Sequence, residues 1–289
     1  MLKKRIIFTL LYQDGFFVQS RNFNLQKVGD INWLEKNYDF KKISFYIDEL
    51  IILDVSRKEK DTDKFIDNLK KVSSYCFIPI SSGGGIDTFE KAQNLLTNGA
   101  DKVLLNTNLK EKLLKKISEV YGEQSIIAGV DYTNVKSKKK ILIKNGTHEI
   151  EGDIKKYLHK VSKLPVGEIY LNSIDKDGTG MGLDFSILDF LPKNNNKSII
   201  MSGGSGNSEH IANGLKNNSI DAIATANPSG GNAPYSYVWS SLVSGVLVGE
   251  TSPIIDSLGV GVYTVVVTDF LSCPPASSTI TINQPSQIT

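Results

Sequence analysis

Short apolar stretches alternate along most of the chain with stretches in which apolar residues recur every three or four positions. The recurring stretches, residues 63–75, 88–99 and 109–122 among them, predict amphipathic helices. The short stretches predict strands at residues 5–11, 49–55, 77–81, 102–106, 126–131, 168–173, 198–201 and 222–226. Eight strands alternating with helices indicate the α/β class and a (β/α)8 TIM barrel, whose parallel sheet closes on itself.

An internal repeat indicates that this barrel consists of two half-barrels. The segment FIPISSGGGIDTFEKAQNLLTNGADKVLLN (77–106) aligns with SIIMSGGSGNSEHIANGLKNNSIDAIATAN (198–227), pairing Gly83 and Gly84 with Gly203 and Gly204 and Asp101 with Asp221. Two sets of four strand-helix units explain a repeat of this length. A doubly wound open sheet does not, and it is the weaker alternative.

The pattern changes near residue 227. Residues 228–289 contain none of the 33 lysines and arginines, and they alternate β-branched with polar residues between Gly, Pro and Ser turns. This predicts a small all-β sandwich whose core includes Trp239 and Tyr263. We therefore predict two domains, 1–227 and 228–289, with a barrel that lacks its last helix. The segment DAIATAN (221–227) fits either the eighth barrel strand or the first strand of the tail.

Charge and cysteine content exclude several classes of protein. A net charge of +2 with three histidines argues against a nucleic-acid partner. Two cysteines, Cys76 and Cys273, are too few for a disulfide framework or a zinc site. The N-terminal apolar run, residues 6–11, is shorter than a signal-peptide core or a membrane span. We expect a cytoplasmic barrel with no metal, no cofactor and no membrane partner.

Polar residues that could carry chemistry lie at the predicted C-terminal strand ends, where the active sites of such barrels are built. A carboxylate such as Asp131 at a strand end suits general acid or base catalysis, although aspartate also often caps a helix or hydrogen-bonds at a strand terminus. The other candidates are Asp54, Asn106, Thr107, Asn172, Ser173, Asp175 and Asp177.

Two glycine loops, SSGGGI and MSGGSGNS, each follow a predicted strand and precede a predicted helix. Backbone N–H groups in such loops can converge on an anion at the helix N-terminus. The symmetric pair indicates a ligand with two phosphates. Glycines that only permit tight turns are the alternative interpretation.

Residues 1–227 resemble the cyclase subunit of imidazole glycerol phosphate synthase, a histidine-pathway barrel. The resemblance rests on the segments KRII, DGFFVQSRNF, DELIILDV, GGGIDTFEKA, GADKVLLNT, GVD, GEIYLNSIDKDGT and SGGSG. It implies a barrel that receives ammonia from a separate glutaminase subunit, forming a heterodimer with it. The barrel then uses the ammonia to cyclise a bisphosphorylated ribonucleotide.

The resemblance implies a charged ammonia gate at the bottom of the barrel, with Arg5, Glu49, Lys102 and Glu168 at its four positions. It also implies that Asp101 lies at the glutaminase interface. A salt-bridged plug that only stabilises the barrel base is the alternative. Four inward charges are costly to bury unless they are paired.

At the mouth, the resemblance implies two catalytic aspartates, but this sequence matches only one of them. Asp131 matches the second, whereas Leu11 occupies the first position and Gln19 occupies the place of a loop lysine. Leucine cannot transfer a proton, so the acid–base pair for cyclisation is incomplete. The phosphate-binding positions are matched by Gly83, Gly84, Gly85, Asn106, Thr107, Asp175, Asp177, Gly178, Thr179, Gly203 and Gly204.

This combination resembles divergent relatives in surface-polysaccharide biosynthesis, which pass ammonia to a third, sugar-modifying enzyme. The sequence thus predicts an ammonia-channelling barrel subunit serving a sugar amidation. An authentic cyclase of histidine biosynthesis and a non-enzymatic surface protein are the alternatives.

The tail resembles an immunoglobulin-like repeat of bacterial gliding-motility and surface adhesins, carried by the segments NAPYSYVW and GVYTVVVTD and by Cys273. Such repeats are extracellular, whereas the resemblance places the barrel in the cytoplasm. We therefore hypothesise that the chain is a chimera, joined near residue 227 by an assembly or reading error and not a selected two-domain protein, with apolar surface exposed where the last helix is missing.

Overall fold

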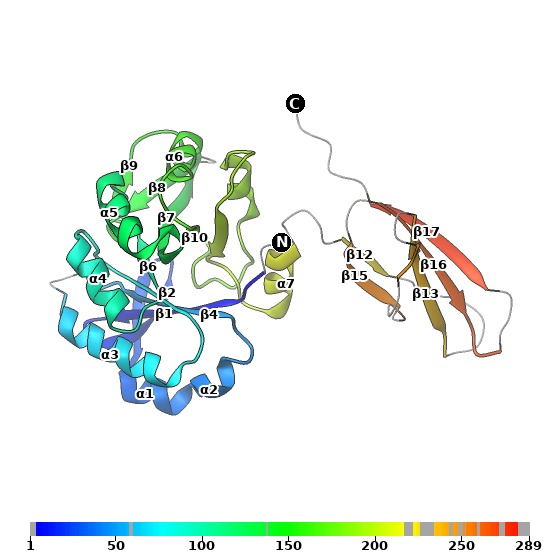
Figure 1. Ribbon diagram of the computed structural model, residues 1–289, viewed down its shortest axis with the longest axis horizontal. Helices are drawn as coiled ribbons and strands as arrows, with labels where there is room; N and C mark the ends of the chain where they lie inside the picture. The colour runs from blue at the N-terminus through cyan, green and yellow to red at the C-terminus, as the bar shows by residue number, and fades with distance from the viewer. Residues whose placement is uncertain are drawn as a thin grey trace. The chain divides into compact units, whose positions relative to one another are not determined.

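The computed structural model describes residues 4–57, 60–136, 138–216, 222–225, 234–242, 245–247, 251, 253–258, 261–271 and 275–282. The chain forms two compact units, Met1–Gly214 and Leu215–Thr289 (Figure 1). The domain boundary predicted at 227 and 228 falls on residues outside those described, and it stays a prediction.

Seven strands of the first unit run parallel in the order β11-β10-β7-β6-β5-β4-β1. Their near-continuous burial is typical of a parallel sheet that is covered by helices. The sequence places the start of each strand to within about three residues and its end to within about four. They are β1 (Ile7–Gln13), β4 (Glu49–Asp54), β5 (Ile80–Gly83), β6 (Lys102–Leu105), β7 (Ile126–Val135), β10 (Glu168–Ser173) and β11 (Ser198–Ser202).

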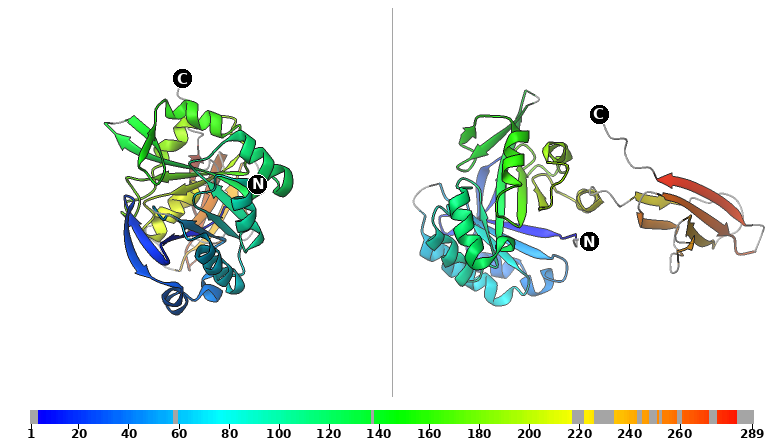
Figure 2. Two further views of the ribbon diagram at one scale, coloured as in Figure 1. Left: turned by 90° about the vertical axis from the view of Figure 1, so that its left-hand side faces the viewer. Right: turned by 45° about the horizontal axis from the view of Figure 1, so that its top comes forward.

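Helices follow these strands along the chain and lie on the outside of the sheet, as Figures 1 and 2 show for α3 to α6. Side chains cap the N-termini of several helices: Asp61, Thr88 and Asp153 each accept a hydrogen bond from a backbone N–H of the first turn. The helices are α1 (Ile31–Asn37), α2 (Phe40–Ile43), α3 (Thr62–Tyr75), α4 (Phe89–Thr97), α5 (Glu111–Tyr121), α6 (Ile154–Val161) and α7 (Ser208–Lys216), with 3-10 turns η1 (Glu123–Ser125) and η2 (Phe185–Phe190).

Antiparallel strands extend the sheet after β1 and again after β7. They are β2 (Phe16–Arg21) and β3 (Asn24–Gly29), then β8 (Lys138–Ile143) and β9 (His148–Ile150). Because β1 and β7 open the two predicted half-barrels, these additions repeat the internal symmetry. Lys138 to Lys140 belong to β8, and Lys139 is paired with Asp184.

The strand register confirms the repeat and corrects one of its alignments. Ile7 pairs with Glu49 as Ile127 pairs with Glu168, so β1 and β7 differ by 120 residues but β4 and β10 by 119. The connection from β7 to β10 is therefore one residue shorter. That shift matches Gly84, rather than Gly83, with Gly203. An added Cβ at Gly84 would meet Asp54 O at the end of β4, and one at Gly203 would meet Ser173 O at the end of β10.

The eighth barrel strand predicted at 222–226 is not in the barrel. Strand β12 (Ala222–Thr225) pairs antiparallel with β15 (Ile254–Leu258) in the second unit, and Ala226 lies outside the described residues. Of the strands described, none bridges β11 to β1. The parallel sheet therefore stays open at this point, because the segment forms the tail's pairing in place of the barrel's.

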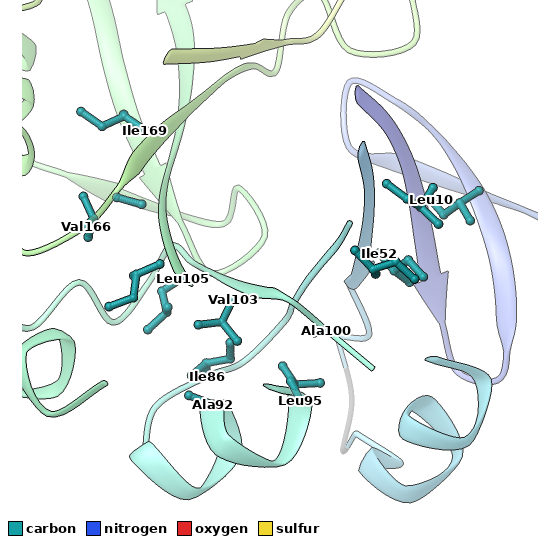
Figure 3. Close-up of a cluster of buried hydrophobic side chains, with 14 of the residues drawn as sticks. Leu10, Ile52, Ile86, Ala92, Leu95, Ala100, Val103, Leu105, Val166 and Ile169 are labelled. Carbon is teal, nitrogen blue, oxygen red and sulfur yellow. The ribbon is translucent and has the colours of Figure 1, made fainter. Parts of the chain in front are cut away.

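Two hydrophobic clusters fill the first unit. The larger lies between the sheet and the helices; Figure 3 shows Val103 of β6 facing Ala92 and Leu95 of α4. The smaller occupies the interior of the curved sheet and contains Ile51, Leu104, Ile127, Tyr170 and Ile200. Successive side chains of a strand point to opposite faces of the sheet, so they contribute alternately to the outer and the inner cluster.

Beyond the last residues of α7, the described part of the second unit consists of strands and the segments that connect them. Strands β13 (Ser236–Ser241), β14 (Gly245–Val246), β16 (Gly261–Thr268) and β17 (Ala276–Ile282) form an antiparallel sheet in the order β14-β13-β16-β17. Its core confirms the predicted role of Trp239, which is 2% exposed, with Tyr263 packed against the same cluster. Across the described part of the chain, no helix has the length and apolar character of a membrane span.

Candidate functional site in the barrel

A cavity of about 590 Å³ opens at the C-terminal ends of the parallel strands. This is the end at which barrels of this class bind ligands. Nine predicted site residues line the cavity, namely Asp54, Gly84, Gly85, Asn106, Thr107, Asp131, Asn172, Asp177 and Gly178. The predicted residues Gly83, Ser173, Asp175, Thr179, Gly203 and Gly204 are not among its lining residues.

Asp131 on β7 is held by two amide side chains from the neighbouring strands. Asn106 Nδ2 donates to Asp131 Oδ2 (3.2 Å), and Asn172 Nδ2 donates to Asp131 Oδ1 (3.1 Å). Burial raises the pKa of Asp131 to about 7, the hydrogen bond from Asn172 opposes the rise, and the charge of Asp177 adds to it. A carboxyl group with such a pKa can give or take a proton near neutrality.

The β1 side of the cavity is apolar at the position where cyclisation would need a second proton-transfer group besides Asp131. Leu11 pairs in register with Leu53 on one side and Val18 on the other, and all three line the cavity. Gln19, also lining it, is exposed on β2. Asp131 therefore has no carboxyl group facing it from the Leu11 position, and the other two carboxylates lining the cavity, Asp54 and Asp177, are engaged by Lys60 and by the β2–β3 turn.

The first glycine loop borders the cavity next to an ion pair that the sequence did not reveal. Gly84 and Gly85 adopt positive φ (+122° and +73°), and Lys60 lies against Gly85. Lys60 Nζ donates to the backbone oxygen of Asp54 (2.6 Å) and contacts its carboxylate (3.0 Å). Thr107 is also engaged, because its hydroxyl accepts from Lys144 N (3.0 Å). No motif marks Lys60, since its position depends on the long connection from β4 to α3.

The second glycine loop is covered by chain that follows β10. Gly182 N donates to Gly204 O (2.8 Å), and a Cβ at Gly204 would lie 2.2 Å from Gly182 O. Gly182 therefore covers Gly204, while Gly203 lies against the end of β10 at Ser173. The two glycine loops occupy equivalent backbone positions, but only the first one borders the mouth cavity.

The aspartates after β10 bind the two antiparallel extensions. Asp177 accepts from the Ser20 hydroxyl and from Phe23 N (3.1 Å), which fastens the β2–β3 turn to the mouth. Asp175 accepts from the side chain of Thr133 and from Asn134. Thr179 donates to Lys176 O (2.7 Å). In this conformation these residues hold the rim of the mouth, and phosphate binding by them remains a prediction.

Four charged side chains form a ring at the opposite, N-terminal end of the strands. Arg5 donates to Glu49 (2.7 Å) and to Glu168 (2.7 Å), while Lys102 contacts the same two carboxylates at 2.9 and 2.8 Å. Both glutamates are buried. Burial opposes ionisation of Glu168, but the hydrogen bonds from Arg5 and Lys102 outweigh it and lower the pKa of Glu168. Each buried charge in the ring thus has two partners of opposite sign.

Two further polar residues support this ring. Ser81, a buried β5 residue that sequence reasoning passed over, donates to Glu49 Oε1. The sequence could have indicated Ser81, because it lies two residues before Gly83 on the same strand and so faces the same side of the sheet. Asp101 accepts a hydrogen bond from Ile80 N (2.8 Å) and is exposed, so it connects the starts of β5 and β6. Its predicted place at a partner interface stays a prediction.

The fold and its mouth define a (β/α)-barrel protein with a ligand-sized cavity at the strand C-termini and a charged ring at their N-termini. Residues 5–227 match the model of the family described as histidine biosynthesis protein. A protein from Parasynechococcus marenigrum, provisionally named imidazole glycerol phosphate synthase subunit hisF2, is 48% identical over 228 residues, covering 78% of this chain and 85% of its own. The imidazole glycerol phosphate synthase subunits HisF of Chlorobaculum tepidum and Prosthecochloris aestuarii are 34% and 35% identical, covering 78% of this chain and 90% of theirs.

The chain belongs to the histidine biosynthesis family, among the HisF-like imidazole glycerol phosphate synthase cyclase subunits. The matched region ends at residue 227. Strands β13 to β17 lie beyond it.

Proposed function

We propose that this chain is the barrel subunit of a glutamine-dependent amidotransferase, which receives ammonia from a glutaminase and passes it through the barrel without carrying out cyclisation. The ammonia goes to a third enzyme that amidates a sugar nucleotide. The observation that carries this proposal is the contrast between the two ends of one strand: β1 follows Arg5 of the charged ring and has Leu11 at the mouth.

The intact ring supports the conduit. Burying four charges is costly, and replacing such a network with apolar residues is often neutral or stabilising. A barrel whose base served only stability would not need them. The glutaminase docks at this end, where the ring faces out of the barrel base, and a phosphorylated small molecule occupies the mouth.

The apolar β1 side of the mouth supports the loss of cyclisation. Cyclisation through acid and base steps requires proton transfer at two positions, and Asp131 alone supplies one. The hisF2-named relative shares more identity with this chain (48%) than the two HisF subunits do (34% and 35%), in keeping with a branch separate from theirs.

The test is a cyclisation assay on the full chain with the bisphosphorylated ribonucleotide and ammonium salt, with the Chlorobaculum tepidum HisF subunit as the positive control. We expect cyclised product from the control and none above the blank from this chain. Product formation by this chain at a rate near that of the control would refute the proposal.

One observation favours an authentic cyclase as the second candidate. The pKa of Asp131, raised by burial to about 7, suits catalysis as well as it suits a structural acid. The same assay separates the two functions, because an authentic cyclase must turn over with ammonium salt alone.

For the tail, we propose an immunoglobulin-like adhesin repeat of extracellular type, which an assembly or reading error, and not a selected gene fusion, has joined to the barrel. The antiparallel sheet around Trp239 and the end of the family match at residue 227 support a separate module. Long-read sequencing across residues 221–234 tests the fusion. One uninterrupted reading frame in the genome would refute it.

A further inference from the structure

A tyrosine hydroxyl lies in the barrel interior between the charged ring and the mouth. Glu168, Tyr170 and Asn172 occupy alternate positions of β10 and therefore face the same side of the sheet. Glu168 belongs to the ring and Asn172 donates to Asp131. Tyr170 stands between the two ends of the barrel on the same strand.

The surroundings of Tyr170 are apolar except at its hydroxyl. The ring packs in the interior cluster with Ile51, Leu104, Ile127 and Ile200. Its register partner on β7 is Gly129, which has no side chain to compete for the space. Tyr170 Oη donates to Ser202 Oγ on β11 at 2.7 Å. Tyr170 and Ser202 are the hydroxyl pair discussed below.

The hydroxyl pair is reachable from the mouth. Both of its residues line the 590 Å³ cavity, as do Thr9 and Gly129. Burial raises the pKa of Tyr170 to about 12, the hydrogen bond with Ser202 opposing it, so the hydroxyl is neutral at physiological pH. The Thr9 side chain also hydrogen-bonds with the Tyr170 hydroxyl, so an amine N–H that donates to Tyr170 Oη shares or replaces that contact, while Ser202 Oγ can donate its own proton.

We infer that the hydroxyl pair is a binding site for a small neutral amine at the floor of the mouth cavity. The amine nitrogen accepts the Ser202 proton while one amine N–H donates to Tyr170 Oη. An ammonium ion is disfavoured, because it cannot accept a hydrogen bond and the apolar walls would not compensate for its lost hydration. For this chain the amine is ammonia, an assignment that rests on the proposed function.

The probe for this site is methylamine, whose methyl protons report contact by NMR with carbon-13-labelled tyrosine and phenylalanine rings. The signals of residue 170 are assigned by comparison with Tyr170→Leu. We expect concentration-dependent contacts between the methyl group and the ring of residue 170. Tyr170→Phe and Ser202→Ala each remove one hydroxyl and should weaken binding about fivefold or more, the effect of one lost hydrogen bond.

Three charged groups near the pair could mimic such a site, namely Asp131 and Asp177 toward the mouth and Glu168 toward the base. Between about pH 8 and about pH 9 the neutral fraction of an alkylamine rises about tenfold. Asp131 is already ionised there, because its pKa is about 7. Apparent affinity should therefore rise about tenfold across this window. Affinity that is unchanged with pH, or that disappears in Asp131→Asn, would show a cation held by carboxylates and overturn the inference.

The matched control is Tyr12→Phe. Tyr12 is buried, and its hydroxyl accepts from Asn68 (3.3 Å) in the outer core, so this variant loses a comparable hydrogen bond away from the cavity. Methylamine binding should be unaffected by it, and equal weakening in Tyr12→Phe and Tyr170→Phe would contradict the site. The measurement needs neither glutaminase nor acceptor. A failed cyclisation test and a failed amine-binding test are thus separate results.

Discussion

Asn172 and Asp131 are register partners on adjacent parallel strands, and the amide of Asn172 donates to the carboxyl of Asp131 at 3.1 Å. The interaction ties the mouth end of β10 to that of β7. Because burial nevertheless raises the pKa of Asp131 to about 7, its protonation is linked to folding.

Asp131 should therefore make the stability of the barrel fall as pH rises from about 4 past 7. The native state holds a proton that the unfolded state releases near pH 4, so the contribution is complete at low pH and lost above the native pKa. We expect the free energy of unfolding of wild type, relative to Asp131→Asn, to fall by about 2 kcal/mol between about pH 5 and about pH 8.

Urea denaturation at the two pH values checks this prediction. Asp67→Asn, at an exposed position of α3, is the control and should track wild type at both. A pH-independent difference between wild type and Asp131→Asn would mean that Asp131 titrates as an ordinary aspartate.

The charged ring should be costly to break at one member. Glu49→Ala leaves Arg5 and Lys102 sharing Glu168 alone and removes the acceptor of Ser81. Breaking a buried network of this kind costs about 3–5 kcal/mol. The control, Glu111→Ala, breaks a solvent-exposed pair with Lys115 on α5 and should change the stability far less than Glu49→Ala does. Similar losses in chemical denaturation of the two variants would show that the ring contributes no more than a surface pair.

Much of the barrel follows from local sequence pattern. The predicted bounds of β10 match the structure, and those of β4 and β6 agree to one residue, because an apolar run between polar turns specifies a buried strand without help from distant residues. The predicted Phe77 to Ser81 strand was displaced from β5 (Ile80–Gly83), since Phe77 is apolar yet exposed. Apolar character alone does not report burial.

The sequence pattern did not predict which strands pair with each other or which distant residues form hydrogen bonds. The segment at 222–225 carries the strand pattern that the repeat assigns to the barrel, but it pairs with β15 of the tail. Strand propensity does not say which edge a strand joins. Likewise, the sequence places Asp175 and Asp177 at the mouth, yet their hydrogen bonds to the β2–β3 and β7–β8 segments depend on contacts between residues 41 to 157 positions apart.

The symmetric glycines give a prediction about the backbone. At Gly84 (φ +122°) an added Cβ would lie 2.2 Å from Asp54 O, and at Gly203 (φ +89°) 2.4 Å from Ser173 O. Alanine at either position should cost about 2–5 kcal/mol, combining backbone strain with a clash against main chain.

Gly152→Ala is the control for the strain component. Gly152 has φ +135°, but an added Cβ would meet nothing within 4 Å. In thermal or urea unfolding, Gly84→Ala and Gly203→Ala should be much less stable than Gly152→Ala. Equal losses in all three would mean that φ alone, and not the close approach of two strand ends, requires glycine in these loops.

Leu11 and Gln19 should together account for the loss of cyclisation that we propose. Both line the cavity on the side opposite Asp131, and Leu11 is only partly buried, so a carboxylate there can reach solvent and a bound ligand. In the double variant Leu11→Asp, Gln19→Lys, the mouth has a second proton-transfer group and a cation. We expect ammonium-dependent cyclisation of the bisphosphorylated ribonucleotide to rise about 100-fold or more above wild type, within the range that a positioned acid or base contributes. The triple variant that adds Asp131→Asn should return to the background rate. If the double variant stays at background while still binding the ribonucleotide, the covered second glycine loop, and not the β1 side, limits the chemistry.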